Sequence, residues 1–110
     1  MDTGTHPDLA DALNQLWLRH LSENLVRISI LETAAAACTG GVLSHEQREA
    51  AISAAHKLAG VLGSFDLKEG TELARELEAL YSKGNGPDAA AGPQLASLAA
   101  KLRFLAENRE

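Results

Sequence analysis

Apolar residues recur every three or four positions along most of the chain, with polar residues between them. The first such run contains Leu9, Leu13, Leu16, Trp17, Leu21, Leu25, Ile28, Leu31 and Ala34–Ala37, and it stops at Thr39-Gly40-Gly41. This spacing places the apolar side chains on one helical face, and glycine is a typical C-terminal stop. It predicts one helix of about 30 residues, or two helices joined near residues 19–24, where Ser22 suits an N-cap. Residues 1–6 are expected to form a flexible leader, with Pro7 and Asp8 opening the helix.

Two further helices are predicted in the middle of the chain, each with a start signal. Ser44 and Gln47 match a capping box, so a helix is expected from His45 to about Gly63. Asp66 and Glu69 repeat the same logic, with Asp66 as the expected N-cap. The helix that follows has Leu67, Leu73, Leu77 and Leu80 facing inward, and Glu69, Glu72, Arg75, Glu76 and Glu78 facing solvent. The turn residues of Lys83–Pro87 end it.

The last helix is predicted after a short alanine-rich piece, Asp88–Gly92, which reads as loop or frayed helix. Pro93 suits a first helical position. An apolar stripe then follows at helical spacing, formed by Leu95, Leu98, Ala99, Leu102 and Leu105. Four such stripes with short connections predict an all-α, antiparallel up-down four-helix bundle. We expect residues 1–110 to form a single domain of this kind.

Composition and charge support this fold class and exclude several functions. Hydrophobic residues make up 45% of the chain, aromatic residues only 4%, and the net charge is −5. Basic residues are scattered, so no nucleic-acid partner is expected, and no apolar run or signal segment indicates a membrane. The lone Cys38 cannot form an internal disulfide, which suits a cytoplasmic protein. We read it as a small residue near a helix end, without a redox role.

The stretch around His56 carries the chemical signal. Glycines follow this histidine at positions 60 and 63, although each costs roughly 1 kcal/mol relative to alanine inside a helix. In helical projection Ala51, Ala55, Leu58, Leu62 and Phe65 form the buried face. His56 lies outside that face, and its nearest neighbours are Gly63, Glu49, Gly60, Ser53 and Ser64. The layout predicts an exposed imidazole on a low surface that another macromolecule approaches.

The exposed imidazole is a candidate nucleophile, because its unperturbed pKa of about 6.5 leaves it largely neutral at pH 7. Covalent catalysis by histidine needs an orienting or charge-stabilising group. The sequence offers little: Lys57 lies about 100° around the helix, and Glu49 lies two turns back. We therefore expect a passive nucleophile whose partner supplies the catalysis. The competing interpretation is a histidine that only packs or caps within the bundle.

The residues around His56 resemble those of a known family. The segment Ala55-His56-Lys57-Leu58-Ala59-Gly60-Val61-Leu62-Gly63-Ser64-Phe65, followed by Leu73-Ala74-Arg75-Glu76-Leu77-Glu78, is similar to the histidine phosphotransfer (HPt) domain of bacterial two-component phosphorelays. The resemblance covers the central third by motif and nearly the whole chain by helix layout. It implies that His56 accepts a phosphoryl group from a receiver-domain aspartyl phosphate and passes it to another receiver aspartate.

The resemblance also implies the rest of the site. Gly60 leaves room for the phosphoryl group and the docking receiver, and Gly63, Lys57, Ser53 and Ser64 line the same surface. The expected partners are response-regulator receiver domains, a hybrid histidine kinase, or both, and the chain is expected to be a monomer. No cofactor or metal site is expected in this chain, because the magnesium ion of such transfers belongs to the receiver. The other histidines, His6, His20 and His45, have no metal-ligand spacing.

One departure from the family pattern leaves a question. Many members have a lysine three residues after the histidine, where this chain has Ala59. Lys57 is either a weak electrostatic helper or an ordinary surface lysine. The alternative function is therefore a pseudo-HPt bundle, which docks a receiver or kinase without carrying phosphate. An unrelated helical enzyme fragment is the third interpretation, but the sequence shows no second catalytic group.

Overall fold

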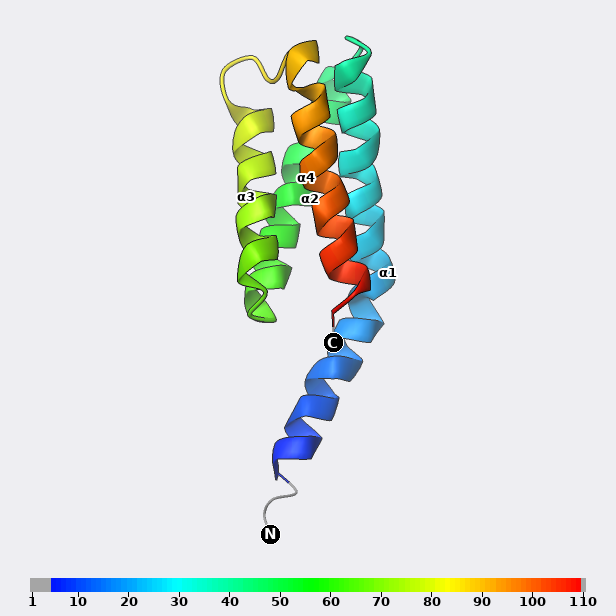
Figure 1. The fold of residues 1–110 in the computed structure, drawn as a ribbon, viewed down its shortest axis with the longest axis vertical. Coiled ribbons are helices and arrows are strands. Elements are labelled where there is room, and N and C mark those ends of the chain that lie inside the picture. The colour runs from blue at the N-terminus through cyan, green and yellow to red at the C-terminus, as the bar shows by residue number, and fades with distance from the viewer. Residues whose placement is uncertain (1–4, 110) are drawn as a thin grey trace.

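The first helix, α1, spans Thr5–Thr39 and runs the whole length of the molecule (Figure 1). The computed structural model describes residues 5–109, with side chains from Leu9 onward. Three shorter helices follow: α2 at His45–Ser64, α3 at Lys68–Ser82 and α4 at Gly92–Glu107, with the short 3-10 turn η1 at Ala89–Ala91 before α4. Each helix packs against its neighbours in the chain and α4 packs back against α1. The described residues thus form the expected antiparallel up-down four-helix bundle.

Helix α1 is continuous, so the alternative of two helices joined near residues 19–24 is wrong. Ser22 lies inside the helix and caps nothing. The helix also begins at Thr5, before Pro7, because proline is tolerated throughout the first helical turn. Residues 5 and 6 of the expected leader are therefore helical, and residues 1–4 lie outside the described part of the chain.

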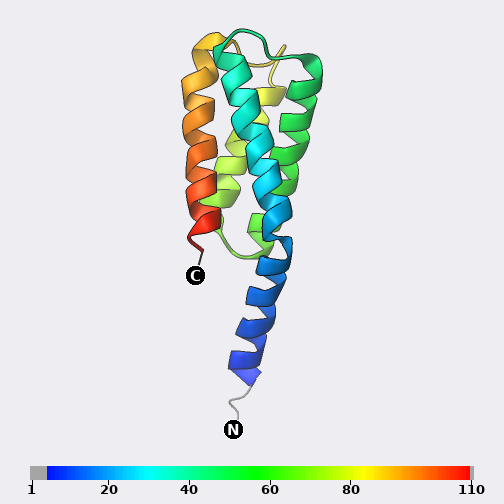
Figure 2. The ribbon, with the colours of Figure 1, turned by 90° about the vertical axis from the view of Figure 1, so that its right-hand side faces the viewer.

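The N-terminal part of α1 projects beyond the ends of the other helices in both views (Figure 1 and Figure 2). Leu9, Leu13 and Leu16 continue the apolar face of α1 but are 60%, 44% and 40% exposed. Trp17 is the first α1 side chain that the bundle buries, at 2% exposure. Its ring makes an edge-on contact with Phe65, and the Arg109 guanidinium lies over both rings. The predicted stripe is therefore real, but its first three leucines do not belong to the core.

Helices α1 and α2 both end in a turn residue with a left-handed backbone conformation, and the end of α2 corrects a prediction. After α1, Gly41 adopts a φ of +73° while the N–H of Val42 donates to the carbonyl of Ala37, as the glycine stop predicted. After α2, Asp66 takes this role with a φ of +59°, and the N–H of Leu67 donates to the carbonyl of Leu62. Asp66 is thus not the N-cap of α3: it closes α2, and α3 starts after Leu67 without a side-chain cap.

The register of α2 against α3 is held at both ends of the pair. The capping box predicted for Ser44 and Gln47 is present, with both hydrogen bonds at 3.0 Å. One turn later, Arg48 donates to the carbonyl oxygens of Tyr81, Ser82 and Gly84 at 2.7, 3.2 and 2.9 Å. A cation at the C-terminus of α3 also suits the helix dipole. The tight turn at Phe65–Leu67 sets the register at the opposite end.

The core consists of leucines and alanines, with few large side chains. Helix α2 contributes Ala51, Ala54, Ala55, Leu58, Ala59 and Leu62, which are at most 7% exposed. Phe65, the remaining residue of the predicted buried face, is half-buried. The alanines allow the neighbouring helices to approach closely, and the leucines fill the space between them. Because this face is buried, the opposite face of α2, which carries His56, is turned to solvent.

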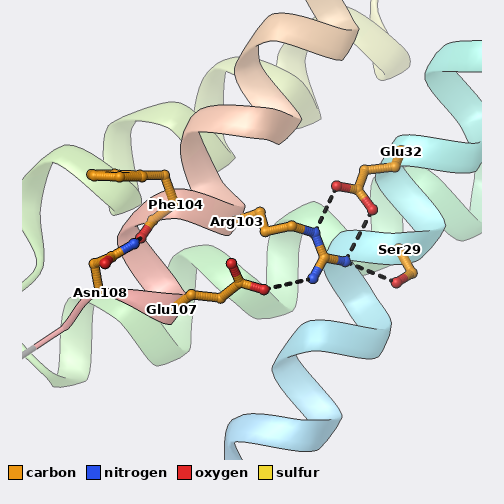
Figure 3. A network of polar contacts seen from close by, with 6 residues as sticks. All are labelled: Ser29, Glu32, Arg103, Phe104, Glu107 and Asn108. Carbon is orange, nitrogen blue, oxygen red and sulfur yellow. Dashed lines mark hydrogen bonds and ion pairs between the residues drawn. The ribbon is translucent and has the colours of Figure 1, made fainter.

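On the far side of the bundle, Arg103 joins α4 to α1 (Figure 3). Its guanidinium donates to both carboxylate oxygens of Glu32, at 2.8 and 3.0 Å, to Ser29 at 3.1 Å and to Glu107 at 3.1 Å. These hydrogen bonds, chiefly the one to Glu32, raise the pKa of the guanidinium. The bidentate pair fixes α1 against α4 and leaves the α2–α3 surface free of this network.

Candidate functional site

His56 lies in the middle of α2 on its solvent-facing side, as the helical projection predicted. Its side chain is 74% exposed. Ala55 on one side and Leu58 on the other are buried, so the backbone that carries the imidazole is held by the core. The helix therefore presents an accessible ring, and the alternative of a histidine packed inside the bundle is excluded by this exposure.

A carboxylate from the neighbouring helix contacts the imidazole. Nδ1 of His56 lies 3.0 Å from Oε2 of Glu78 on α3. An ionised carboxylate has no proton to donate, so Nδ1 is the donor and carries the hydrogen. In the neutral imidazole this leaves the lone pair on Nε2, the nitrogen farther from Glu78. The contact selects the tautomer in which Nε2 is the nucleophile.

Glu78 is the site residue that the sequence reasoning missed. The spacing of residues along the third helix predicts that it lies on the solvated acidic face together with Glu69, Glu72 and Glu76. In the structure those three are exposed, whereas the Glu78 side chain is only 31% exposed and reaches across to His56. Such a contact depends on how two helices pack, and the pattern along one helix does not contain it.

The two glycines near His56 are not required by the fold. A Cβ atom on Gly60 would meet no atom within 4 Å, and one on Gly63 would meet only Oγ1 of Thr71, at 3.7 Å. Both residues have ordinary helical backbone angles. Alanine would therefore fit at either position of the free protein and would favour the helix. What the glycines provide is an open surface one and two turns after the histidine.

The predicted serines and lysine flank this surface. Ser53 and Ser64 are exposed, and the Ser64 hydroxyl donates to the carbonyl oxygen of Gly60 at 3.0 Å. Lys57 is exposed and lines a groove toward α1 together with Ser53 and Glu23. The groove lies on the side of α2 away from Glu78. Lys57 thus lies on the α1 side of α2, whereas Glu78 contacts His56 from the α3 side.

A second groove runs between α1 and the C-terminal half of α2, with a volume of about 340 Å³. It is lined by Leu16, His20, Glu23, Asn24, Arg27, Val61, Ser64 and Phe65. Ser64 belongs both to this groove and to the surface next to Gly60. The accessible surface beside His56 therefore continues toward α1 as a mostly apolar depression.

Among the side chains that the structure describes, from Leu9 to Arg109, no three belonging to His, Cys, Asp or Glu gather closely enough to hold a metal ion. His20 and His45, which have no predicted role, are exposed, and the side chain of His6 lies outside the described part. Within the same range, no helix is long and apolar enough to cross a membrane.

The described residues thus form a bundle of four antiparallel helices that presents an exposed histidine in the middle of the second one. The family model described as Hpt domain matches residues 5–108. The chain therefore belongs to the Hpt domain family. No significant match was found among curated proteins or among solved structures. Family membership connects the chain with two-component phosphorelays, in which Hpt domains act with receiver domains and histidine kinases as carriers.

Proposed function

We propose that the protein is a phosphorelay intermediate and that His56 carries the phosphoryl group. The observation that supports this most directly is the hydrogen bond between Nδ1 of His56 and Glu78, on an imidazole that is 74% exposed. The contact directs the free lone pair of Nε2 toward solvent, where a partner delivers its phosphoryl group. Gly60 and Gly63, with Ser53, Ser64 and Lys57 at the edges, form the surface on which the receiver domain docks.

The transfer conserves protons at the histidine. The Nε2 lone pair attacks phosphorus of the receiver's aspartyl phosphate, the P–O bond to the aspartate breaks, and the aspartate leaves as a carboxylate. The phosphorylated imidazole keeps its proton on Nδ1, so the ring becomes positively charged, and the Glu78 carboxylate compensates this charge. In the return reaction, the carboxylate of the next receiver attacks phosphorus and the N–P bond breaks.

The chain contributes a nucleophile and its orienting carboxylate, and the partner contributes the rest of the catalysis. We propose no cofactor for this protein: the magnesium ion that neutralises the phosphoryl oxygens belongs to the acidic pocket of the receiver. The partners are receiver domains of response regulators, of a hybrid histidine kinase, or of both. The same surface serves donor and acceptor in turn, so a monomer is sufficient.

A docking bundle without phosphate transfer is the second candidate, and Ala59 is the observation that favours it. Without the lysine found in many relatives, the helix that bears His56 lacks a cation one turn after the histidine. In this case the receiver binds the same surface, but no phosphoryl group moves. The two candidates agree on binding and differ only in covalent labelling.

Incubation with a phosphorylated receiver domain tests the proposal. We expect an acid-labile, base-stable label on the wild-type protein and its loss in His56→Gln. His45→Gln is the matched control, because His45 is also exposed on α2 but lies in its first turn. Full labelling of His56→Gln would refute the assignment. Binding of the receiver without labelling of the wild type would favour the docking bundle.

A further inference from the structure

Phosphorylation of His56 creates an electrostatic problem that the proposed function alone does not solve. The phosphoryl group brings up to two negative charges to Nε2, on the far side of the ring from the Glu78 carboxylate, which already compensates the charge of the ring itself. A further cation close to the phosphoryl group would stabilise these charges. Ala59 carries no charge, and Lys57 lies on the α1 side of α2 in a groove with Glu23. The remaining basic residue near the site in register lies on α3.

Arg75 is the basic residue of α3 nearest to the site in register. It lies three residues before Glu78, so the two side chains occupy neighbouring positions on one face of the helix. Helices α2 and α3 are antiparallel, so three residues forward from His56 correspond to three residues back from Glu78. Arg75 is thus opposite Ala59. Four residues further, Gly63 faces Thr71, whose Oγ1 lies 3.7 Å from the position of a Cβ on Gly63, and this approach supports the same register.

The surroundings of Arg75 leave it available. Its side chain is exposed and lines a groove of about 250 Å³ together with Gly63, Thr71 and two acidic residues, Asp66 and Glu72, so it lies on the side of α3 that faces α2. Among the side chains from Leu9 to Arg109, no carboxylate lies within ion-pair distance of its guanidinium, whereas Arg48 and Arg103 are occupied by other partners. No atom lies within 4 Å of a Cβ built on Gly60, so the surface one turn after His56 is open.

We propose that Arg75 binds the phosphoryl group on His56 and provides the positive charge that position 59 does not. This inference rests on the proposed function, since it concerns the phosphorylated histidine. The guanidinium suits the task because its planar array of donors matches phosphoryl oxygens and stays charged at all relevant pH values. The cation is supplied across the helix pair by α3 instead of along α2.

Phosphoramidate provides a test that needs no partner protein. The P–N bond of this reagent breaks and a P–Nε2 bond forms on His56. The nitrogen leaves as ammonia with the proton that the reagent already carries, while Nδ1 of His56 keeps its own. The ³¹P resonance that is absent in His56→Gln then reports the titration of the phosphoryl group. A nearby cation favours the dianion, so Arg75→Gln should raise the titration midpoint. For a direct contact, with the charges about 4 Å apart in water, the expected shift is about 0.8 pH unit.

Two further variants make the test specific. Lys57→Gln removes the same charge on the other side of His56 and should shift the midpoint less than Arg75→Gln does, while Arg75→Lys should keep most of the effect. Circular dichroism confirms that each variant is folded.

The outcomes separate this inference from the proposed function. Equal midpoints in wild type and Arg75→Gln, or equal shifts in Arg75→Gln and Lys57→Gln, overturn the role of Arg75. Failure of phosphoramidate to label His56 in the folded protein also overturns it. The remaining outcome is that Arg75→Gln shifts the midpoint of His56 labelled by phosphoramidate, but a phosphorylated receiver transfers nothing to the protein. That result counts against the phosphorelay function and leaves the role of Arg75 in place.

Discussion

Nδ1 of His56 and Oε2 of Glu78 are 3.0 Å apart, and the two residues belong to different helices. The imidazole is therefore oriented by α3 while its position is set by α2. A histidine on a single exposed helix would rotate freely, and either nitrogen would carry the proton. The pairing of α2 with α3 is thus part of the site, and the protein needs its tertiary fold to define which nitrogen reacts.

Substitution of Glu78 should slow phosphoryl transfer to His56 without unfolding the bundle. Glu78→Ala removes both the hydrogen bond and the charge that compensates the phosphorylated ring, and we expect a loss of roughly tenfold in transfer rate, as for one partly exposed charged hydrogen bond. Glu78→Gln keeps an acceptor for Nδ1–H and should lose less. The measurement is the initial rate of labelling by a phosphorylated receiver.

Glu76→Gln is the control for this effect, because Glu76 lies two residues away on the outer face of α3 and its carboxylate contacts Gln94 instead. It should transfer at the wild-type rate. If Glu76→Gln and Glu78→Gln slow transfer equally, the effect is one of general surface charge, and the orienting role of Glu78 is wrong.

Gly60→Ala should have opposite effects on stability and function. Because an added Cβ meets no atom within 4 Å, the substitution should stabilise the free protein by about 0.5–1 kcal/mol through helix propensity. The same methyl group occupies the open surface beside His56, so labelling by a receiver should become slower. Urea unfolding measures the first effect and the transfer assay the second.

The control for Gly60→Ala is Ser97→Ala, an exposed position on α4 away from this surface. It should gain a little stability and transfer normally. A Gly60→Ala variant that is more stable and equally fast would mean that the glycine does not serve docking. A destabilised variant would mean that the space around it is smaller than the structure indicates.

Local features of the fold could be predicted from the sequence, whereas contacts between helices could not. The capping box at Ser44 and the glycine stop at Gly41 involve residues a few positions apart, and both are present. The orientation of His56 followed from the apolar face of one helix. The prediction that Asp66 is an N-cap is wrong because an aspartate before a helix suits an N-cap and a turn residue with a left-handed backbone equally well.

The contact between Glu78 and His56 follows from the register of α2 against α3, but this register can be counted only once the position of the turn between them is known. The connection between α2 and α3 is only Phe65–Leu67, so the two helices form a tight antiparallel pair in which residues equally far from one turn residue face each other. His56 and Glu78 are equally far from Leu67, whereas counting from Asp66, the centre of the connection, would pair His56 with Glu76. The sequence alone does not say which turn residue is the point of symmetry, so it does not determine this register.

The N-terminal part of α1 projects beyond the core, so alanine substitutions of apolar residues along this helix should differ greatly in their cost to the free energy of unfolding. Trp17→Ala removes a side chain that is 2% exposed and packs against Phe65, and it should cost about 3–5 kcal/mol. Leu9→Ala, at 60% exposure on the same helix, should cost less than about 0.5 kcal/mol. Urea unfolding of both variants checks this. Similar losses would show that the overhang is packed in solution.

Cys38 predicts how the stability of the protein depends on alkaline pH. The thiol is buried and donates to the carbonyl oxygen of Asp88 at 3.0 Å. Burial, with a smaller contribution from the Asp88 charge, raises the pKa of the thiol in the folded state above its ordinary value. The folded protein therefore keeps the proton at a pH where the unfolded chain has lost it.

The sign of the effect follows from this difference in bound protons. Below the unfolded pKa both states are protonated and the contribution is complete. As the pH rises through 9 toward the folded pKa, the unfolded state ionises first, so the free energy of unfolding falls. The slope approaches about 1.4 kcal/mol per pH unit for a single group. The pKa of Tyr81 is also raised by burial, and it acts in the same direction at higher pH.

Cys38→Ala isolates the thiol, because Tyr81 is retained in both proteins. Urea unfolding under reducing conditions, from pH 7 to pH 10, should give a steeper loss of stability in the wild type than in Cys38→Ala. The variant is expected to start from a lower stability at pH 7, since it lacks the buried sulfur and its hydrogen bond, so the two curves should converge as the pH rises. Parallel curves would show that the thiol does not titrate differently in the folded and unfolded states, and that the buried environment of Cys38 has no consequence for stability at alkaline pH.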